Sequence, residues 1–420
     1  NTPNEIPITK DEKEPTNGRT EENYGASFQQ FGLLGINRMH DDGFRGEGMH
    51  IAVIDGGFTN ANINPLFRQA RIVDTYNFTR NTVDVYNNIT STHGTRVLSL
   101  LAAFQDGQLV GSAYKASFYL FTTENDNANI ENKIEEVNWI FAAERSDSLG
   151  VDIITTSLGY RTFDDSSLNY TINDLDGKTA LISQAAAVAV RTGMIVVACA
   201  GNEALASWRK IIFPADVDSV LTVGSVDANK DYAPSSSRGK TADGRIKPDV
   251  VAMGQNAVVG FPSGNISVSS GTSFAAPQIA GLAAGLWQAN PTMSNMQIVN
   301  MIRKSGTRFS NPSDSIGYGI PNYVKIKILS DQTQNFGNNI TVYPNPLASN
   351  QLQIWFDEQY IGKNITLTLS DVLGKTYFVE YIKTQELNYQ LDTSNYNLTS
   401  GLYFLRISSQ GLTKMVKVIK

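Results

Sequence analysis

The stretch Ile51-Ala-Val-Ile-Asp-Gly-Gly57 decides the fold. Four consecutive apolar residues before an aspartate and two glycines are typical of a strand that is buried on both faces and ends at the edge of a sheet. Ligands and catalytic groups gather at the carboxyl ends of such strands. Asp55 is therefore a candidate functional residue, although an aspartate that ends a strand is more often a turn residue.

Outward from this stretch, short apolar segments alternate with helical patterns up to about residue 330. The expected strands are 117–122, 151–157, 194–200 and 219–226, and the expected helices are 93–104, 132–145, 179–191 and 273–289. This alternation predicts an α/β fold with a parallel sheet that is covered by helices on both faces.

The two ends of the chain differ from this region in composition and hydrophobic pattern. Residues 1–22 carry six acidic and three basic residues without apolar periodicity, which predicts a flexible acidic leader before a main domain at 23–330. A polar linker is expected at 331–340. Six segments of period-two alternation follow, and they predict a small antiparallel β-sandwich at 341–420.

Composition excludes several functional classes. Among 420 residues, 34 are Lys or Arg and 40 are Asp or Glu, and this net charge of −6 argues against a nucleic-acid binder. The single cysteine, Cys199, excludes an intrachain disulfide and cysteine-rich metal sites. It is either a reactive thiol or, on a buried apolar segment, a small core residue. No apolar run reaches the roughly 18 residues of a membrane span.

Two further segments carry reactive side chains at helix starts. In Ser91-Thr-His-Gly-Thr-Arg-Val97, His93 opens a helix, and the alternative is a histidine bonded to nearby backbone. In Ser270-Gly-Thr-Ser-Phe-Ala-Ala-Pro277, Ser273 lies where the helix dipole favours negative charge. A plain N-cap serine is the alternative there, but it does not explain the small residues around it.

Together these segments place Asp, His and Ser in one chain order. Ser273 would be the nucleophile, His93 would take its proton, and Asp55 would hold the imidazole tautomer. Asn202, just past the expected strand 194–200, is a candidate donor to the oxyanion. A serine esterase of the α/β-hydrolase type would have a different chain order and different residues around the serine. A non-catalytic surface protein with this fold would lack a triad residue, and none is missing.

Residues 24–325 resemble a subtilisin-like serine peptidase of the subtilase family. The blocks that carry the resemblance are, in chain order, Tyr24-Gly25, Ile54-Asp-Gly-Gly57, His93-Gly-Thr95, Ser157-Leu-Gly159, Ala200-Gly-Asn202, Lys247-Pro-Asp-Val-Val-Ala252 and Gly271-Thr-Ser-Phe-Ala-Ala-Pro277. The resemblance implies an endopeptidase with the triad Asp55, His93 and Ser273 and with Asn202 as oxyanion donor.

The resemblance also implies a substrate cleft. Ser157, Leu158 and Gly159 would form one wall of the P1 pocket, and Ala198, Cys199 and Ala200 the other. Ile212 would lie near the pocket floor, Glu124 near the P2 site and Ile130 near the P4 site, beside a strand at 119–123 that pairs with extended substrate. We expect apolar residues at P1. Glu124 would mildly favour a basic or polar P2 residue if it faces the cleft; the alternative is a solvated loop charge.

The sequence departs from the family pattern at three positions. Arg96 stands where His or Tyr is usual, and Gly56 where Ser or Thr commonly follows the aspartate. Leu66 falls where an aspartate ligand of calcium would be expected, and the loop 105–111 is short. We therefore expect no metal at the active site and no cofactor in catalysis. The sequence leaves a structural calcium open but does not indicate one.

Residues 341–420 resemble the C-terminal sorting domain of the type IX secretion system. The segments that carry this resemblance are Pro344-Asn-Pro346, Asp371-Val-Leu-Gly-Lys375, Gly401-Leu-Tyr-Phe404 and Lys414-Met-Val-Lys-Val-Ile-Lys420. It implies secretion to the medium or surface of a Gram-negative bacterium, with the secretion machinery as a partner of residues 341–420. A generic Ig-like module is the alternative. The other expected partners are extended protein or peptide substrates and an inhibitory propeptide.

Overall fold

The computed structural model describes residues 22–87, 89–125, 131–334, 340–347, 350–356, 360–384, 388–409 and 412–420. The chain divides into two compact units between Ile326 and Lys327. Apart from Glu22, the leader predicted at 1–22 lies outside the described residues. No helix in the described part of the chain is long and apolar enough to span a membrane.

The first unit is built on a seven-stranded sheet in which every neighbouring pair of strands is parallel. Its strand order is β11-β8-β7-β6-β1-β5-β2. The strands are β1 (His50–Asp55), β2 (Arg71–Asn77), β5 (Ser117–Thr122), β6 (Ile153–Thr156), β7 (Ile195–Cys199), β8 (Leu221–Val226) and β11 (Val250–Met253). Because the strands are parallel, their carboxyl ends meet at one edge of the sheet.

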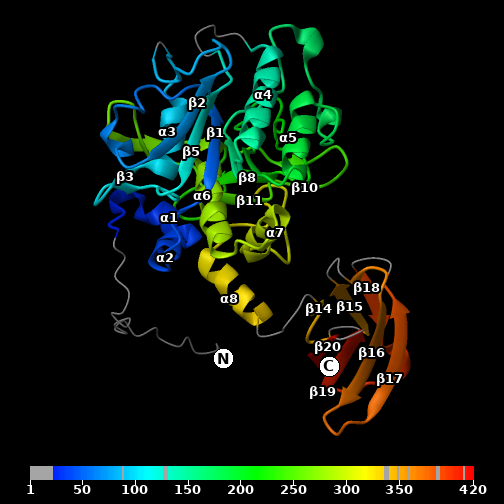
Figure 1. Cartoon of the computed structure of the whole chain (residues 1–420). Coiled ribbons are helices and arrows are strands. Elements are labelled where there is room, and N and C mark those ends of the chain that lie inside the picture. Colours follow the sequence, from blue (N-terminus) through cyan, green and yellow to red (C-terminus); the bar gives the residue numbers. More distant parts are fainter. Residues whose placement is uncertain are drawn as a thin grey trace, which may run out of the picture. The chain divides into compact units, whose positions relative to one another are not determined.

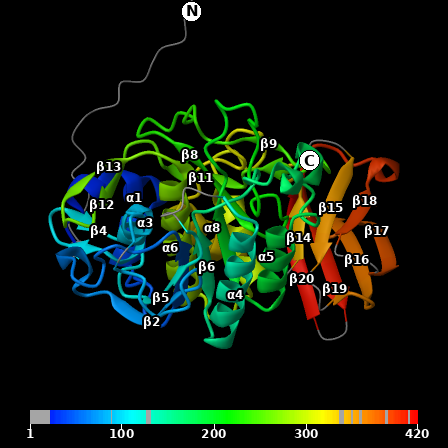
Figure 2. The same ribbon diagram turned by 90° about the horizontal axis from the view of Figure 1, so that it is seen from above.

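Helices cover both faces of this sheet (Figures 1 and 2). The helices nearest the sheet are α3 (His93–Ala102), α4 (Ile134–Ser148), α5 (Leu181–Arg191) and α6 (Thr272–Ala289). Alternate residues of β1 enter different cores: Ile51 and Val53 pack with α3 and α6, whereas Ala52 and Ile54 pack with α4 and α5. Both faces of the strand are therefore apolar, as its continuous apolar run predicts.

The remaining elements of this unit are short or peripheral. They are the helices α1 (Phe28–Leu34), α2 (Ile36–Asp41) and α7 (Asn295–Ser305), the paired strands β3 (Phe104–Gln105) and β4 (Leu109–Val110), β9 (Gly239–Lys240) and β10 (Ile246–Lys247), and β12 (Ala257–Gly260) and β13 (Ile266–Ser269). The apolar patterns did not predict the edge strands β2 and β11. β2 has a mixed polar sequence because it is only partly covered, and β11 has four residues.

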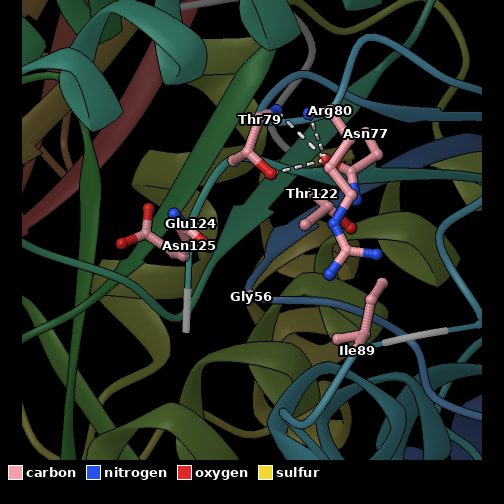
Figure 3. Close-up of a pocket in the computed structure, with 8 residues that line it drawn as sticks. All are labelled: Gly56, Asn77, Thr79, Arg80, Ile89, Thr122, Glu124 and Asn125. Atoms are coloured by element: carbon pink, nitrogen blue, oxygen red, sulfur yellow. Dashed lines mark hydrogen bonds between the residues drawn. The ribbon is translucent and has the colours of Figure 1, made fainter. Parts of the chain in front are cut away.

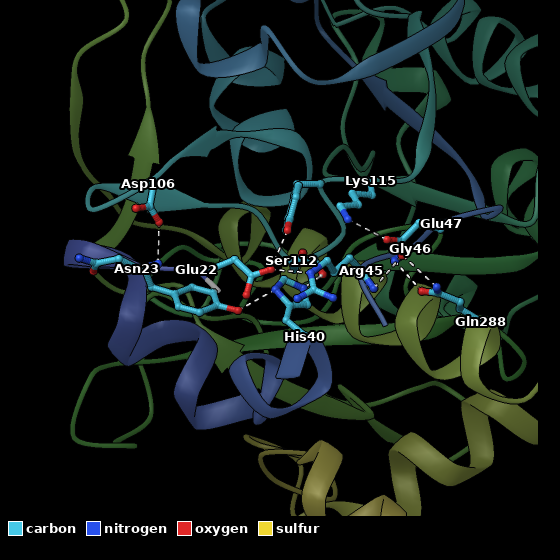
Figure 4. A network of polar contacts seen from close by, with 12 residues as sticks. Glu22, Asn23, His40, Arg45, Gly46, Glu47, Asp106, Ser112, Lys115 and Gln288 are labelled. Atoms are coloured by element: carbon cyan, nitrogen blue, oxygen red, sulfur yellow. Dashed lines mark hydrogen bonds and ion pairs between the residues drawn. The ribbon is translucent and has the colours of Figure 1, made fainter. Parts of the chain in front are cut away.

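A buried polar network ties the start of the described chain to this unit (Figure 4). Glu22 forms an ion pair with Arg45 and accepts a hydrogen bond from the Tyr114 hydroxyl at 2.7 Å. His40 lies 2.6 Å from the Tyr24 hydroxyl through Nδ1 and 3.0 Å from the Ser112 carbonyl through Nε2. Because a carbonyl only accepts, Nε2 carries the proton and Nδ1 accepts from the hydroxyl. His40 is fully buried, and burial lowers its pKa to about 4.

The second unit contains two antiparallel sheets. The three-stranded sheet joins β14 (Ile340–Tyr343), β15 (Gln351–Phe356) and β18 (Asn388–Asp392), and the four-stranded sheet joins β17 (Thr376–Lys383), β16 (Asn364–Asp371), β19 (Leu402–Ser409) and β20 (Leu412–Ile419). Leu352 and Ile354 of one sheet share a core with Leu367 and Leu405 of the other, which confirms the predicted small β domain.

The boundary between the units differs from the predicted linker at 331–340. Helix α8 (Tyr323–Gln334) continues into that segment, and residues 335–339 lie outside the described part. Tyr323 and Ile326 are buried in the core of the first unit and fix the start of the helix. The polar residues 331–334 therefore belong to the end of this helix rather than to a linker.

Candidate active site

Asp55 and His93 meet at the carboxyl edge of the parallel sheet. The His93 Nδ1 atom lies 2.7 Å from Asp55 Oδ1, and the same oxygen accepts the Gly56 N–H at 2.8 Å. A carboxylate only accepts, so Nδ1 carries the proton and Nε2 is left as the basic nitrogen. Asp55 is fully buried, whereas the His93 side chain is 28 % exposed. This arrangement suits a base that faces a cleft.

Gly94 explains how helix α3 begins so close to β1. A Cβ atom at Gly94 would lie 2.3 Å from the Gly57 carbonyl oxygen and 3.0 Å from Asp55 Cβ. Any side chain would push α3 away and open the contact between Asp55 and His93. The glycine after the histidine is therefore a requirement of the geometry.

Ser273 is the second residue of helix α6 and is bonded in both directions to Ser157. The Ser273 hydroxyl donates to the Ser157 carbonyl at 3.3 Å, and the Ser157 hydroxyl donates to the Ser273 carbonyl at 2.9 Å. Pro277, four residues on, has no N–H to give that carbonyl, so the Ser157 hydroxyl takes its place. The Phe274 ring lies 5.7 Å from the His93 ring, which brings the imidazole to this turn.

Asn202 is held beside Ser273 by Thr272. The Asn202 Oδ1 atom accepts the Thr272 N–H at 2.9 Å and its hydroxyl at 3.3 Å, and the Thr272 hydroxyl also accepts the Gly201 N–H. With Oδ1 engaged, the Nδ2 group is the donor that remains for a ligand. Gly271, at φ 148°, would place a Cβ atom 3.4 Å from Nδ2. Thr272 is assigned no role from the sequence, although it directly precedes Ser273 in the block 271–277.

The residues predicted to line the P1 pocket lie together. A Cβ atom at Gly159 would be 2.5 Å from Ile212 Cδ1, and the Cys199 Sγ atom lies 3.8 Å from the Leu158 carbonyl. The Ala200 carbonyl accepts the Ile212 N–H at 3.1 Å, and Ala198, which precedes Cys199 on β7, is fully buried. Burial raises the pKa of the Cys199 thiol to about 11, so this thiol stays protonated and packs as a core residue.

Glu124 is held by two hydroxyl groups rather than by solvent. Glu124 lines the cavity at the ends of β1, β5 and β2, and its carboxylate accepts hydrogen bonds from the buried Tyr160 hydroxyl and from the Thr123 hydroxyl, so it is not a solvated loop charge. Its oxygens lie within 4.8 Å of those of Glu131 and Glu135. Burial, followed by the charge of Glu135, raises the pKa of Glu124 well above its usual range. The sequence could not anticipate this because the Tyr160 partner comes from a distant loop.

Two other predictions concern the strand that pairs with substrate and the residue at the P4 site. The prediction that residues 119–123 pair with substrate is wrong for 119–122, because β5 already pairs with β1 on one side and with β2 on the other. A strand has two edges, and both are occupied here. Ile130, the predicted P4 residue, lies outside the described residues.

The departures from the family pattern also have structural counterparts. The Arg96 guanidinium lies over the rings of Phe261 and Phe274, at 5.5 and 5.4 Å from their centroids, and donates to the Ser269 hydroxyl. It therefore supports the ring that packs on His93. Leu66 is fully buried, and its side chain fills the space beside Gly260, so it offers no oxygen to a cation.

Comparison with known protein families agrees with this fold. The model of the subtilase family matches residues 46–319, and that of the secretion system C-terminal sorting domain matches residues 341–420.

Individual relatives extend the likeness to most of the chain. Subtilisin DY of Bacillus licheniformis is 28% identical over 291 residues, covering 68% of this chain and 93% of its own. Subtilisin E of Bacillus subtilis (strain 168) is 28% identical over 308 residues, covering 71% and 72%. Among solved structures, the MycP3 protease from the type VII (ESX-3) secretion system superposes with a TM-score of 0.57 at 19% identity, covering 73% and 88%. The prenylagaramide maturation protease PagA superposes with a TM-score of 0.55 at 21% identity, covering 70% and 96%.

These solved structures support the fold, whereas the family match covers most of the first unit and includes every candidate site residue described above. The chain therefore belongs to the subtilase family of serine peptidases and carries a secretion-system sorting domain at residues 341–420.

Proposed function

We propose that this protein is a secreted serine endopeptidase that cleaves extended protein substrates through an acyl-enzyme. The observation that carries the proposal is the 2.7 Å contact between buried Asp55 and His93, beside the turn that presents Ser273. A histidine that only bonds to nearby backbone, or a serine that only caps a helix, would not need a buried carboxylate beside the imidazole. The carboxylate fixes the tautomer in which Nε2 can accept the serine proton.

These positions support the following steps. Ser273 Oγ attacks the scissile carbonyl while its proton passes to His93 Nε2, and Asp55 stabilises the imidazolium that forms. The oxyanion accepts hydrogen bonds from Asn202 Nδ2 and from the Ser273 N–H at the start of α6. His93 then protonates the leaving amine as the C–N bond breaks. Water attacks the ester with His93 again as the base, the bond to Ser273 Oγ breaks to release the carboxylic acid, and His93 returns the proton to Ser273. No metal or cofactor enters these steps, so we expect kcat to survive treatment with EDTA.

Covalent labelling tests the assignment of the nucleophile. A fluorophosphonate probe should label the wild-type protein on Ser273, and Ser273→Ala should abolish both labelling and peptide hydrolysis. His93→Ala provides the second control, because it leaves the serine in place but removes the base. Labelling or full activity of Ser273→Ala in a clean preparation would contradict the proposal.

The P1 pocket is proposed to take uncharged, medium-sized apolar side chains. Leu158, Cys199 and Ile212 give it an apolar lining, and burying an unpaired Lys or Arg there would cost several kcal/mol. A cleavage profile on a peptide library measures this preference. Dominant cleavage after Lys or Arg would show that the pocket model is wrong.

Residues 341–420 are proposed to direct the protein through the type IX secretion machinery of a Gram-negative bacterium. The match to a sorting domain and its separate hydrophobic core support this role. Deletion of residues 341–420 should leave active enzyme in the periplasm. Secretion of the shortened protein into the medium would contradict the sorting role, and loss of its fold would indicate a structural role.

A further inference from the structure

A small cavity lies beside the catalytic aspartate. It is a small hollow whose space of about 200 Å³ includes open solvent. Its lining comes from the carboxyl ends of three adjacent strands: Gly56 after β1, Thr122 and Glu124 at the end of β5, and Asn77, Thr79 and Arg80 at the end of β2. Ile89 and Asn125 complete the wall. None of these residues has a part in the catalytic steps proposed above.

Two charged side chains, Arg80 and Glu124, line this cavity and point in different directions (Figure 3). The Arg80 guanidinium extends between Gly56 and Ile89, whereas the Glu124 carboxylate points away toward its partner Tyr160. The turn that carries Arg80 is fixed, because Asn77 Oδ1 accepts the N–H groups of Thr79 and Arg80 and the Thr79 hydroxyl. The Arg80 Nη1 atom also lies 3.5 Å from the Asn87 carbonyl.

A buried hydroxyl adds a second donor. Thr122 is 1% exposed, and its Oγ1 atom has no hydrogen-bond partner among the described residues. Buried hydroxyls rarely remain unpaired unless a ligand or water completes them. A guanidinium and a free hydroxyl on one wall, with the acidic side chain turned away, are suited to bind a carboxylate.

Strand order places this cavity beside the proposed P1 pocket. Ser157 to Gly159 follow β6 and Cys199 ends β7, on one side of β1, while the cavity follows β1, β5 and β2. Successive side chains of an extended peptide point in opposite directions. A substrate whose P1 side chain enters between Ser157 and Cys199 therefore directs its P2 side chain toward the cavity.

We propose that Arg80 determines specificity at P2 and that the enzyme prefers substrates with an acidic residue there. The inference rests on the proposed peptidase function. It replaces the expectation that Glu124 favours a basic P2 residue. Exposed ion pairs change binding by up to about fivefold, and repulsion of Lys has a similar size, so the Glu-to-Lys ratio of kcat/KM should lie between about 2 and about 25 at low ionic strength.

Three quenched peptides that differ only at P2, with Glu, Gln or Lys before a P1 leucine, test the proposal. The wild type should cleave the Glu peptide fastest. Arg80→Gln should bring the Glu-to-Lys ratio close to one, and Arg80→Glu should reverse it. Arg71→Gln is the matched control for net charge: Arg71 begins β2, whose other end carries the turn to Arg80, and this variant should keep the wild-type ratio.

The possible outcomes distinguish a failure of the Arg80 proposal from a failure of the proposed peptidase function. Equal rates on all three peptides, or an unchanged preference in Arg80→Glu, would overturn the role of Arg80. A preference for Lys that disappears in Glu124→Gln would assign P2 to Glu124 instead. If no peptide is cleaved and the fluorophosphonate probe does not react, the proposed function fails, and this inference fails with it.

Discussion

Two histidines of the first unit lie next to polar partners, yet their surroundings make them different groups. His93 is bonded through Nδ1 to buried Asp55, and its side chain is 28 % exposed. His40 is fully buried, and its two ring nitrogens bond to Tyr24 and Ser112. A histidine can exchange protons with a substrate only where its surroundings leave it access, so burial separates the proposed base from the structural residue.

The largest expected effect is the loss of activity when the triad around His93 is changed. Ser273→Ala and His93→Ala should each lower kcat by about 10⁶, and the double variant should lose no more, because triad members act as a unit. Thermal unfolding should change little. Rate measurements on the three variants check this, and multiplicative losses in the double variant would contradict a shared mechanism.

In the buried network around His40, by contrast, a substitution should lower stability rather than activity. Arg45→Ala leaves Glu22 buried without its ionic partner, so the free energy of unfolding should fall by about 3–5 kcal/mol. Urea denaturation in the Ser273→Ala background, which prevents autolysis, measures the change. Arg38→Ala is the matched control, because Arg38 is 51% exposed and its pair with Asp41 should contribute at most about 1 kcal/mol. If both variants lost a similar free energy of unfolding, the buried pair would be no more stabilising than the exposed one.

Within the active site, Asn202 should affect the transition state alone. Asn202→Ala should reduce kcat by about 10²–10³ with little change in KM, because the amide contacts charge that develops only during the reaction. Steady-state kinetics with one peptide separates the two constants. A raised KM at unchanged kcat would instead assign Asn202 to ground-state binding.

The smallest effect concerns pH and His40. Burial lowers its pKa to about 4, whereas the unfolded side chain titrates near 6.5. Between these values the unfolded chain binds more protons, so the free energy of unfolding falls as the pH drops from about 6.5 to 4, by up to about 3 kcal/mol. Urea denaturation at pH 7.5 and 4.5 should show a weaker pH dependence in His40→Gln than in His50→Gln. Equal slopes would exclude His40 as the cause.

The sequence predicted those parts of the fold and site that depend on local patterns. The continuous apolar run before Asp55 predicts a doubly buried strand, and the small residues around Ser273 predict a close approach to that helix start. The apolar pattern did not predict edge strand β2, because this strand is only partly buried and can therefore carry polar residues. The orientation of Glu124 depends on Tyr160, 36 positions away, and no local pattern carries such a pairing.

The proline in helix α6 has a consequence for engineering. By leaving the Ser273 carbonyl to the Ser157 hydroxyl, Pro277 couples one wall of the proposed specificity pocket mechanically to the proposed nucleophile. Grafting a foreign loop at 157–159 to change substrate choice would therefore also disturb the attacking oxygen. Directed evolution of this enzyme should find it easier to change selectivity from the Arg80 side of the cleft, because both the hydroxyl and the carbonyl of Ser273 bond to Ser157, on the 157–159 side.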